Sequence, residues 1–276
     1  MPHSIPTLRV LPVENLLLHE NHDPSRTDSL IERLMSEGFL RNPPVVAPLD
    51  DGGSQYVVLD GANLTMALRT MSIPYILAQV ADHQQNICLK SWNHVLMDTD
   101  TDNFITCMQN IPGLQVSRYQ NNSGIENEST EELARVFLST GEIFILSIPG
   151  NSYADNIAVL NRFERICREN GRVERTNLTS PETLAQTYPN FSALVIHHVL
   201  EISAVLSNAK SGKLLPAGIT RFLVSPRALR VNYPLKELVA SEPLSTKNDT
   251  LQEWIQGRKI ERGIRCYEES TIMFDE

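Results

Sequence analysis

The first eighty residues alternate short apolar runs with two helical segments, and this alternation restricts the fold more than any other feature. The strand-like runs, rich in Val, Ile and Leu, cover residues 8–18, 45–49, 56–59 and 73–80. Between them, apolar residues recur with helical spacing over 24–37, before Gly38, and over 62–71, after Gly61. The pattern predicts a compact N-terminal domain of the α+β class over residues 1–82.

The remaining chain, residues 83–276, has a different pattern of apolar and polar residues. It predicts helices around Trp92 and over 104–110, 131–138, 154–169 and 202–210, and strands over 114–119, 143–148, 193–196 and 221–231. Residues 121–130 are polar and lack an apolar period, which predicts a surface loop. We therefore expect a second, α/β domain over 83–276 that completes the substrate site.

The charge balance excludes one class of function. The 276 residues carry 24 Lys and Arg against 33 Asp and Glu, a net charge of -9. Binding to nucleic acid draws most of its affinity from a basic surface, so a nucleic-acid partner is not expected. Residues 1–7 lack the pattern of a secretory signal, and no apolar run approaches membrane-spanning length, which favours a cytoplasmic protein without a membrane partner. The oligomeric state stays open.

The strongest local motif is an apolar strand that runs through a glycine turn into a helix. It comprises residues 57–65 and includes Asp60, Gly61, Ala62, Asn63 and Thr65. Unpaired N–H groups and the positive end of the helix dipole make such a turn an anion site, and a glycine lets a phosphate approach the backbone. The Thr65 hydroxyl can add a donor. In the alternative interpretation, Asp60 and Asn63 simply cap the helix.

Three other groups of residues are candidates. Glu20 follows the first apolar run and could act as a general base, although a glutamate in a solvated loop is common. Basic residues and a threonine lie close together late in the chain. They could bind a carboxylate or a phosphate, or they could simply face water. Trp92 either packs in the core or offers its ring as a flat surface for a ligand. The late group consists of Lys213, Thr220, Arg221, Arg227 and Arg230.

A metal site is not expected. His197, His198 and Glu201 have a spacing that could place ligands on one face of a helix. Neither an H-E-x-x-H pattern nor a third histidine accompanies them.

Taken together, the segments resemble the free L-serine kinases of the ParB/sulfiredoxin fold. The matching stretches follow the family order and lie at 16–20, 37–46, 59–63 and 214–221. The resemblance implies transfer of a phosphoryl group from ADP or ATP to the hydroxyl of L-serine, which gives O-phospho-L-serine. Mg2+ would neutralise the nucleotide phosphates, as phosphoryl transfer generally requires.

The resemblance also implies roles for individual residues. Glu20 matches the catalytic glutamate that accepts the serine proton, and Asp60 with the turn 61–65 matches the segment that holds the nucleotide phosphates. We therefore expect Glu20 and Asp60 to be the catalytic residues. Trp92, Thr220 and Arg221 match substrate-pocket positions. Charge and position in the sequence add Arg41 to the nucleotide site, and Lys213 and Arg230 to the substrate site.

The chain departs from the family pattern within the turn. Asn63-Leu64 replaces the usual His-Arg pair, which removes a fixed positive charge near the phosphates. Either Mg2+ with Arg41 or Arg221 compensates, or the protein is a non-catalytic regulator that binds a nucleotide, an effector or DNA. Other branches of the fold fit less well: sulfiredoxins need a cysteine where Ala62 stands, and ParB CTPases carry two arginines where Asn63 and Leu64 stand.

Overall fold

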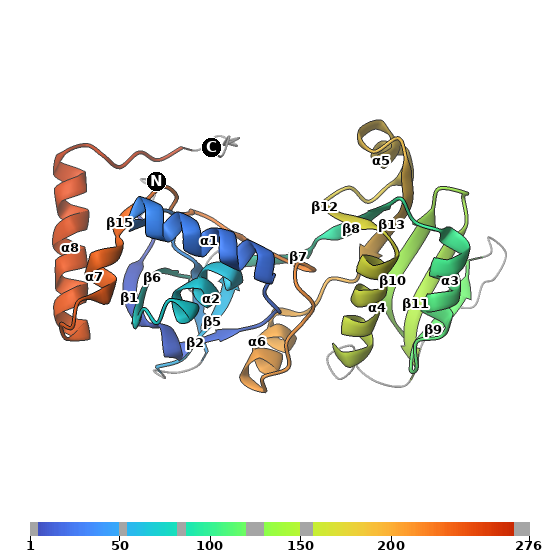
Figure 1. Cartoon of the computed structure of the whole chain (residues 1–276), viewed down its shortest axis with the longest axis horizontal. Helices are drawn as coiled ribbons and strands as arrows, with labels where there is room; N and C mark the ends of the chain where they lie inside the picture. Colours follow the sequence, from blue (N-terminus) through green and yellow to red (C-terminus); the bar gives the residue numbers. More distant parts are fainter. Residues whose placement is uncertain (1–4, 50–53, 82–86, 120–129, 150–156, 268–276) are drawn as a thin grey trace. The chain divides into compact units, whose positions relative to one another are not determined.

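The protein packs as two compact units. The computed structural model describes residues 5–49, 54–81, 87–119, 130–149 and 157–267. The first unit contains Met1–Leu16, Pro24–Gln85 and Val224–Glu276, and the second contains Leu17–Asp23 and Asn86–Leu223. Each unit combines strands and helices, which confirms the predicted α+β class (Figure 1). The chain leaves the first unit near the predicted boundary at residue 82, and it returns to that unit from Val224 onwards.

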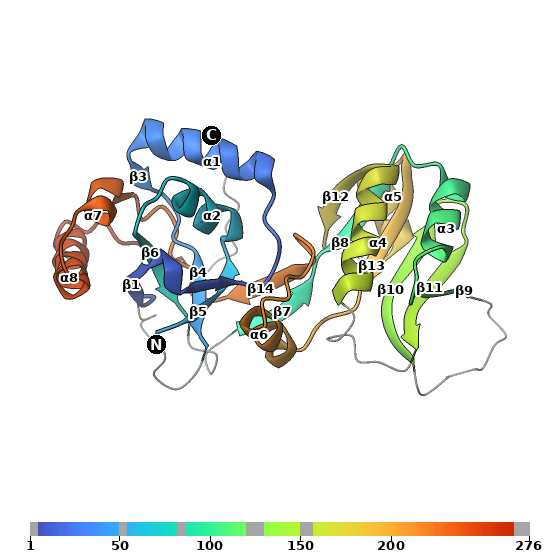
Figure 2. The same cartoon turned by 60° about the horizontal axis from the view of Figure 1, so that its bottom comes forward.

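A five-stranded sheet forms the centre of the first unit, in the order β1-β6-β4-β5-β2. Its strands are β1 (Leu8–Pro12), β2 (Leu16–Leu18), β4 (Val45–Pro48), β5 (Tyr56–Asp60) and β6 (Tyr75–Val80), and the 3-10 turn η1 (Val13–Asn15) joins β1 to β2. β4 and β5 pair antiparallel, as a hairpin requires, whereas β4 and β6 are parallel. The helices α1 (Pro24–Glu37) and α2 (Ala62–Thr70) lie side by side in this unit (Figure 2).

The C-terminal segment completes the first unit. β15 (Tyr233–Pro234) pairs with β3 (Phe39–Leu40), and α7 (Leu235–Val239) and α8 (Leu244–Ile260) follow. Asn248 of α8 contacts the edge strand β1: its Oδ1 accepts the Val10 N–H and its Nδ2 donates to the Val10 carbonyl, both at 3.0 Å. One side chain thus satisfies both backbone groups of an edge-strand residue and docks α8 against the sheet.

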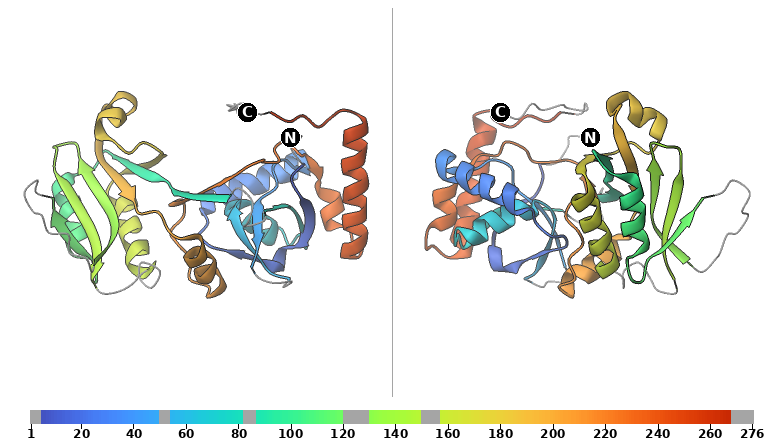
Figure 3. Two further views of the ribbon diagram at one scale, coloured as in Figure 1. Left: turned by 180° about the vertical axis from the view of Figure 1, so that it is seen from behind. Right: turned by 45° about the vertical axis from the view of Figure 1, so that its right-hand side comes forward.

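The second unit contains a six-stranded antiparallel sheet. Its order is β12 (Arg172–Thr176), β8 (Asn93–Met97), β13 (Phe191–His197), β10 (Thr130–Leu138), β11 (Ile143–Pro149) and β9 (Gln115–Arg118). The helices α3 (Thr101–Gln109) and α4 (Ile157–Asn170) pack together on one face, and the view from behind shows the strands in front of them (Figure 3). The unit also contains α5 (Pro181–Thr187), α6 (Ile202–Lys210) and a small sheet formed by β7 (Ile87–Ser91) and β14 (Thr220–Val224).

Two of the predicted helices are wrong. The region around Trp92 forms the strands β7 and β8, in which the polar Asn93 and His94 are buried among apolar residues and obscure the strand pattern. Residues 130–138 form β10, although Glu, Leu, Ala and Arg favour a helix there. β10 is paired on both sides, with β11 and β13, so tertiary pairing overrides the local preference. Most of the predicted loop 121–130 lies outside the described residues.

The helices of the described chain are short. The longest of them, α8, has 17 residues and carries basic residues in its last turn. Among these helices, none combines the length and the apolar composition that crossing a bilayer requires.

We expect Asn248→Ala to destabilise the first unit. The change leaves the N–H and the carbonyl of Val10 without their partner, and unsatisfied groups of this kind cost about 1–3 kcal/mol. Urea unfolding of the full chain measures the change in the free energy of unfolding. Gln252→Ala, at an exposed position on the same helix, is the matched control. Equal midpoints for the two variants would contradict this role for Asn248.

Candidate active site

The Glu20 carboxylate is held in the second unit by two donors. Glu20 forms an isolated parallel bridge with Leu215, and the Leu215 N–H donates to the His19 carbonyl at 2.9 Å. This pairing brings Glu20 beside the segment that leads into β14. Its Oε2 accepts the Gly218 N–H at 3.0 Å and the Thr220 hydroxyl at 2.9 Å. The side chain is 19% exposed, so the carboxylate is oriented and still reachable.

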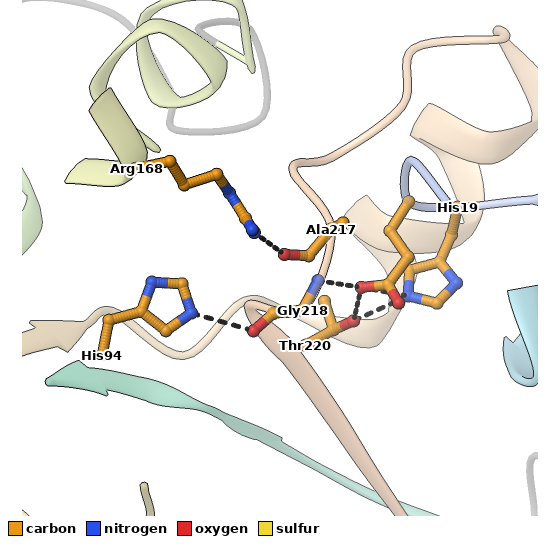
Figure 4. A network of polar contacts seen from close by, with 7 residues as sticks. His19, His94, Arg168, Ala217, Gly218 and Thr220 are labelled. Carbon is orange, nitrogen blue, oxygen red and sulfur yellow. Dashed lines mark hydrogen bonds and ion pairs between the residues drawn. The ribbon is translucent and has the colours of Figure 1, made fainter. Parts of the chain in front are cut away.

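His19 supports this arrangement from the buried side. Its side chain is 1% exposed, and its Nε2 lies 2.7 Å from Thr220 Oγ1 (Figure 4). The Thr220 hydroxyl donates its only proton to Glu20, so it accepts from His19, and this assigns the His19 proton to Nε2. The ring of Phe222 meets the His19 ring edge-on at 5.4 Å. A chain of hydrogen bonds therefore runs from His19 through Thr220 to Glu20.

Two residues missed by the sequence analysis hold the backbone at Ala217 and Gly218. His94 Nε2 lies 3.1 Å from the Gly218 carbonyl, and Arg168 donates to the Ala217 carbonyl at 2.8 Å (Figure 4). Gly218 adopts φ +77°, a left-handed conformation that favours glycine. His94 lies on β8 and Arg168 on α4, far from residue 218 in the sequence. A polar residue inside an apolar strand was the only sequence signal for His94.

Trp92 and Arg221, predicted for the substrate site, lie together in this unit. The Arg221 guanidinium carbon is 4.5 Å from the centre of the Trp92 ring. The backbone N–H of Trp92 also donates to the Ile219 carbonyl at 2.9 Å, which fixes the tryptophan backbone beside the strand that carries Thr220. The planar guanidinium stacks on the ring, and this geometry leaves its edge N–H groups for a carboxylate or phosphate.

The turn between β5 and α2, in the first unit, has the predicted strand–glycine–helix geometry. Gly61 stands before α2 with φ +104°. A Cβ added to Gly61 would lie 2.6 Å from the Pro44 Cβ, so both the backbone conformation and the neighbouring chain require glycine. The first N–H groups of a helix have no acceptor within that helix, and α2 provides them next to a residue without a side chain.

Thr65 is placed differently from its predicted role. Its side chain is fully buried, and its hydroxyl donates to the Gly61 carbonyl at 3.0 Å. The Thr65 N–H donates to the same carbonyl at 2.9 Å. Thr65 therefore stabilises the turn from inside the helix rather than presenting its hydroxyl on the surface.

Arg227 contacts Asp60 at the same turn. The Arg227 Nη2 lies 2.6 Å from the Asp60 Oδ2, and the Asp60 side chain is 55% exposed. The buried Gln79 holds both sides of Arg227: its Nε2 donates to the Pro226 carbonyl at 2.9 Å, and its Oε1 accepts the Ala228 N–H at 2.8 Å. The sequence showed Arg227 only as one member of a basic group. The fold assigns it to the glycine turn.

Arg41 and Arg230 line one pocket of about 190 Å³ in the first unit, together with Phe39 and Asn232. Arg41 pairs with Glu37 at 2.8 Å. The Arg230 N–H donates to the Asn42 Oδ1 at 2.8 Å. A small pocket lined by two arginines suits an anion.

Lys213 lies in the second unit, on the turn after α6, where its side chain is exposed. Its backbone N–H donates to the Asn208 carbonyl at 2.9 Å.

His197 and Glu201 do not share a helix. His197 ends β13, whereas Glu201 precedes the first turn of α6. The helical arrangement that their spacing would allow is therefore not formed. His197 is instead buried next to Glu164, and His198 is exposed.

The chain is similar to named serine kinases. SbnI of Staphylococcus aureus (strain NCTC 8325 / PS 47), an ATP-dependent L-serine kinase, is 21% identical over 288 residues that cover all of both chains. An ATP-dependent L-serine kinase of Staphylothermus marinus is 33% identical over 91 residues, which are 33% of this chain and 35% of that protein. No protein-family model matches the chain.

Solved structures of serine kinases have a similar fold. A truncated SbnI superposes with a TM-score of 0.70 at 19% identity, covering 92% of this chain and 97% of the other. A free serine kinase in complex with AMP gives a TM-score of 0.67 at 15% identity, over 86% and 98% of the two chains. The chain resembles the free L-serine kinases. The predicted resemblance and fold are thus confirmed.

We expect Gly61→Ala to disrupt the glycine turn. A left-handed alanine costs about 1–2 kcal/mol, and the contact with Pro44 adds to this cost. Gly38→Ala is the matched control, because Gly38 has φ +73° and nothing lies within 4 Å of its added Cβ. Thermal unfolding of the full-length variants measures the difference. A loss for Gly61→Ala no larger than that for Gly38→Ala would contradict the close approach.

Proposed function

We propose that the protein phosphorylates free L-serine on its hydroxyl, with ATP or ADP as donor and O-phospho-L-serine as product. The observation that carries the proposal is the Glu20 carboxylate, held by Gly218 and Thr220 in the unit that also contains the stacked Trp92 and Arg221. Similarity along the whole chain to a protein named L-serine kinase supports it. A cytoplasmic location suits these small-molecule substrates.

In the proposed reaction, Glu20 accepts the proton of the serine hydroxyl. The hydroxyl oxygen forms a bond to the terminal phosphorus of the nucleotide, the bond from that phosphorus to the bridging oxygen breaks, and ADP or AMP leaves. Both donors to Glu20 bind Oε2. We therefore assign Oε1 as the oxygen that faces the substrate. The two hydrogen bonds hold the carboxylate in one orientation, which favours proton transfer along a defined path.

Arg221 and Thr220 are proposed to belong to the part of the site that binds L-serine. The Trp92 ring holds the guanidinium of Arg221 by one face, so its N–H edge can bind a substrate carboxylate bidentately. Thr220 orients Glu20 directly. Trp92 is proposed to form one wall of the serine pocket. The exposed Lys213 stays a proposed substrate-site residue, where its charge could attract the serine carboxylate.

The glycine turn is proposed to bind the nucleotide phosphates. The backbone at Gly61, Ala62 and Asn63 would contact them, while Thr65 supports the turn. Arg227 supplies a positive charge at this turn, where Leu64 lacks one. Mg2+ bound to the phosphates would neutralise their charge, and the exposed Asp60 carboxylate offers the oxygen ligand that this cation prefers.

The pocket of Arg41 and Arg230 adds a second anion site in the first unit. The two guanidinium groups could bind a further phosphate of the nucleotide. Arg41 was expected at the nucleotide and Arg230 at the substrate. Because both line one pocket, we propose that both bind the nucleotide.

Glu20→Gln should reduce serine phosphorylation by about 10²–10⁴-fold, because the variant keeps the shape of the side chain and loses the proton acceptor. Phosphorus NMR of the full chain with Mg2+ and L-serine measures the product, once with ATP and once with ADP. The nucleotide that is converted identifies the donor. Nucleotide affinity should stay within about threefold of wild type, since only proton transfer is removed.

Glu201→Gln is the control, at an exposed position in the same unit. A folded wild-type protein that forms no phosphomonoester from either nucleotide would overturn the serine kinase proposal. Equal activity of the Glu20→Gln variant and the wild type would overturn the assignment of the base.

Arg227→Gln should weaken nucleotide binding roughly tenfold, because a charge-assisted contact near the phosphates is lost. Isothermal titration with ADP measures the affinity. Arg9→Gln, an exposed arginine in the same unit, is the control. If the two variants bind ADP equally well, Arg227 does not replace the missing charge at Leu64.

A further inference from the structure

Three titratable side chains converge in the interior of the second unit, and the proposed reaction uses none of their facing atoms. His94 comes from β8, Glu164 from α4 and His197 from the end of β13. The side chains are 1%, 2% and 1% exposed, respectively. His94 Nδ1 lies 3.0 Å from Glu164 Oε2, and His197 Nε2 lies 3.1 Å from Glu164 Oε1. One donor atom from each residue lies within 4.8 Å of the others.

The facing atoms lie at hydrogen-bond distance but outside hydrogen-bond geometry. His94 Nδ1, both carboxylate oxygens of Glu164 and His197 Nε2 all lack an aligned hydrogen-bond partner among the described residues. Leaving buried polar atoms without partners is costly, and native proteins rarely do so. Ligand atoms that lie close together without hydrogen-bonding one another suit a shared cation.

The hydrogen bond on the other side of His94 favours the same interpretation. A carbonyl only accepts, so the bond to Gly218 places the His94 proton on Nε2. With this proton on Nε2, His94 can offer its Nδ1 as a ligand atom on the side of Glu164, 3.0 Å from its Oε2. Histidines that bind metals usually donate their second N–H to a backbone carbonyl in this way.

The residue types and their spacing also suit a cation. Two imidazoles and a carboxylate are common ligands of Zn2+, and here one ligand atom from each lies within 4.8 Å of the others. Ligand atoms around a tetrahedral Zn2+ lie about 3.4 Å apart, so on binding the contacts of 3.0 and 3.1 Å would widen slightly and the widest separation, up to 4.8 Å, would shorten.

We propose that His94, Glu164 and His197 bind a divalent transition-metal ion, with Zn2+ the best match for two imidazoles and a carboxylate. The ion would join two strands and the helix α4 inside the unit. It would also fix His94 and, through it, the Gly218 carbonyl. Its role is therefore structural, and its presence does not depend on the proposed function.

Metal analysis of the full-length protein tests the proposal. The protein carries a tag without histidines and is expressed with added zinc and purified by gel filtration. Mass spectrometry of the metal content should find about one zinc ion per wild-type chain. Glu164→Gln and His197→Gln should each bind zinc at least 100-fold more weakly, since even losing a partner of a ligand costs about 10–100-fold. His198→Gln, at the exposed neighbouring position, should keep the ion.

A second measurement covers variants that fail to fold. The wild-type chain is unfolded in the presence of a chelator. It is then refolded in three samples, one with Co2+, one with Zn2+ and one with the chelator alone. Bound Co2+ should give the visible absorption of a four-coordinate ion, and Zn2+ should raise the unfolding temperature. Purified wild type with less than about a tenth of an ion per chain, together with equal unfolding temperatures in zinc and chelator, would overturn the proposal in favour of a histidine–glutamate ion pair.

Discussion

The hydrogen bonding of the Ala217–Gly218 segment is the constraint on which the candidate active site depends. Its carbonyls bind Arg168 and His94, and its Gly218 N–H binds Glu20. Three elements distant in the sequence are thus tied to one peptide segment. A carboxylate on a loop would otherwise sample many orientations, and each of them would cost entropy to restrict on substrate binding. The fold fixes the orientation of Glu20 in advance, as efficient proton transfer needs.

A comparable arrangement holds the glycine turn of the first unit. Gly61 lets the chain turn tightly against Pro44, and Thr65 closes the first helical turn from inside. Gln79 binds the backbone on both sides of Arg227, which directs this arginine at Asp60. Gln79 is 3% exposed, and a buried amide is tolerated because the backbone satisfies both its carbonyl and its NH₂ group. In both units, buried polar side chains help to orient partly exposed charged ones.

The sequence could predict the local elements and not the contacts between them. The turn at Gly61 was predictable because its strand, glycine and helix are contiguous, and α6 was predicted at its observed bounds for the same reason. The helix predicted over residues 131–138 was wrong, because this segment becomes the strand β10 by pairing with partners elsewhere in the chain. Glu20, Trp92, Thr220 and Arg221 were separate candidates in the sequence, and only the family resemblance joined them in one site, since no local pattern links residues 200 positions apart. His94 and Arg168 belong to no motif and could be found only from the fold.

The environment decides the chemistry of the carboxylates in this chain. Glu164 is enclosed by two imidazoles and has no access to solvent, so its charge can only be balanced internally. Glu20 accepts two neutral donors and stays partly exposed, and Asp60 faces an arginine at the surface. A carboxylate that must accept a proton needs a free oxygen and only moderate stabilisation of its charge. Glu20 keeps the partly exposed carboxylate that its proposed role requires. Burial alone would raise the pKa of Glu164, but the two histidines lower it by more, which opposes proton uptake there.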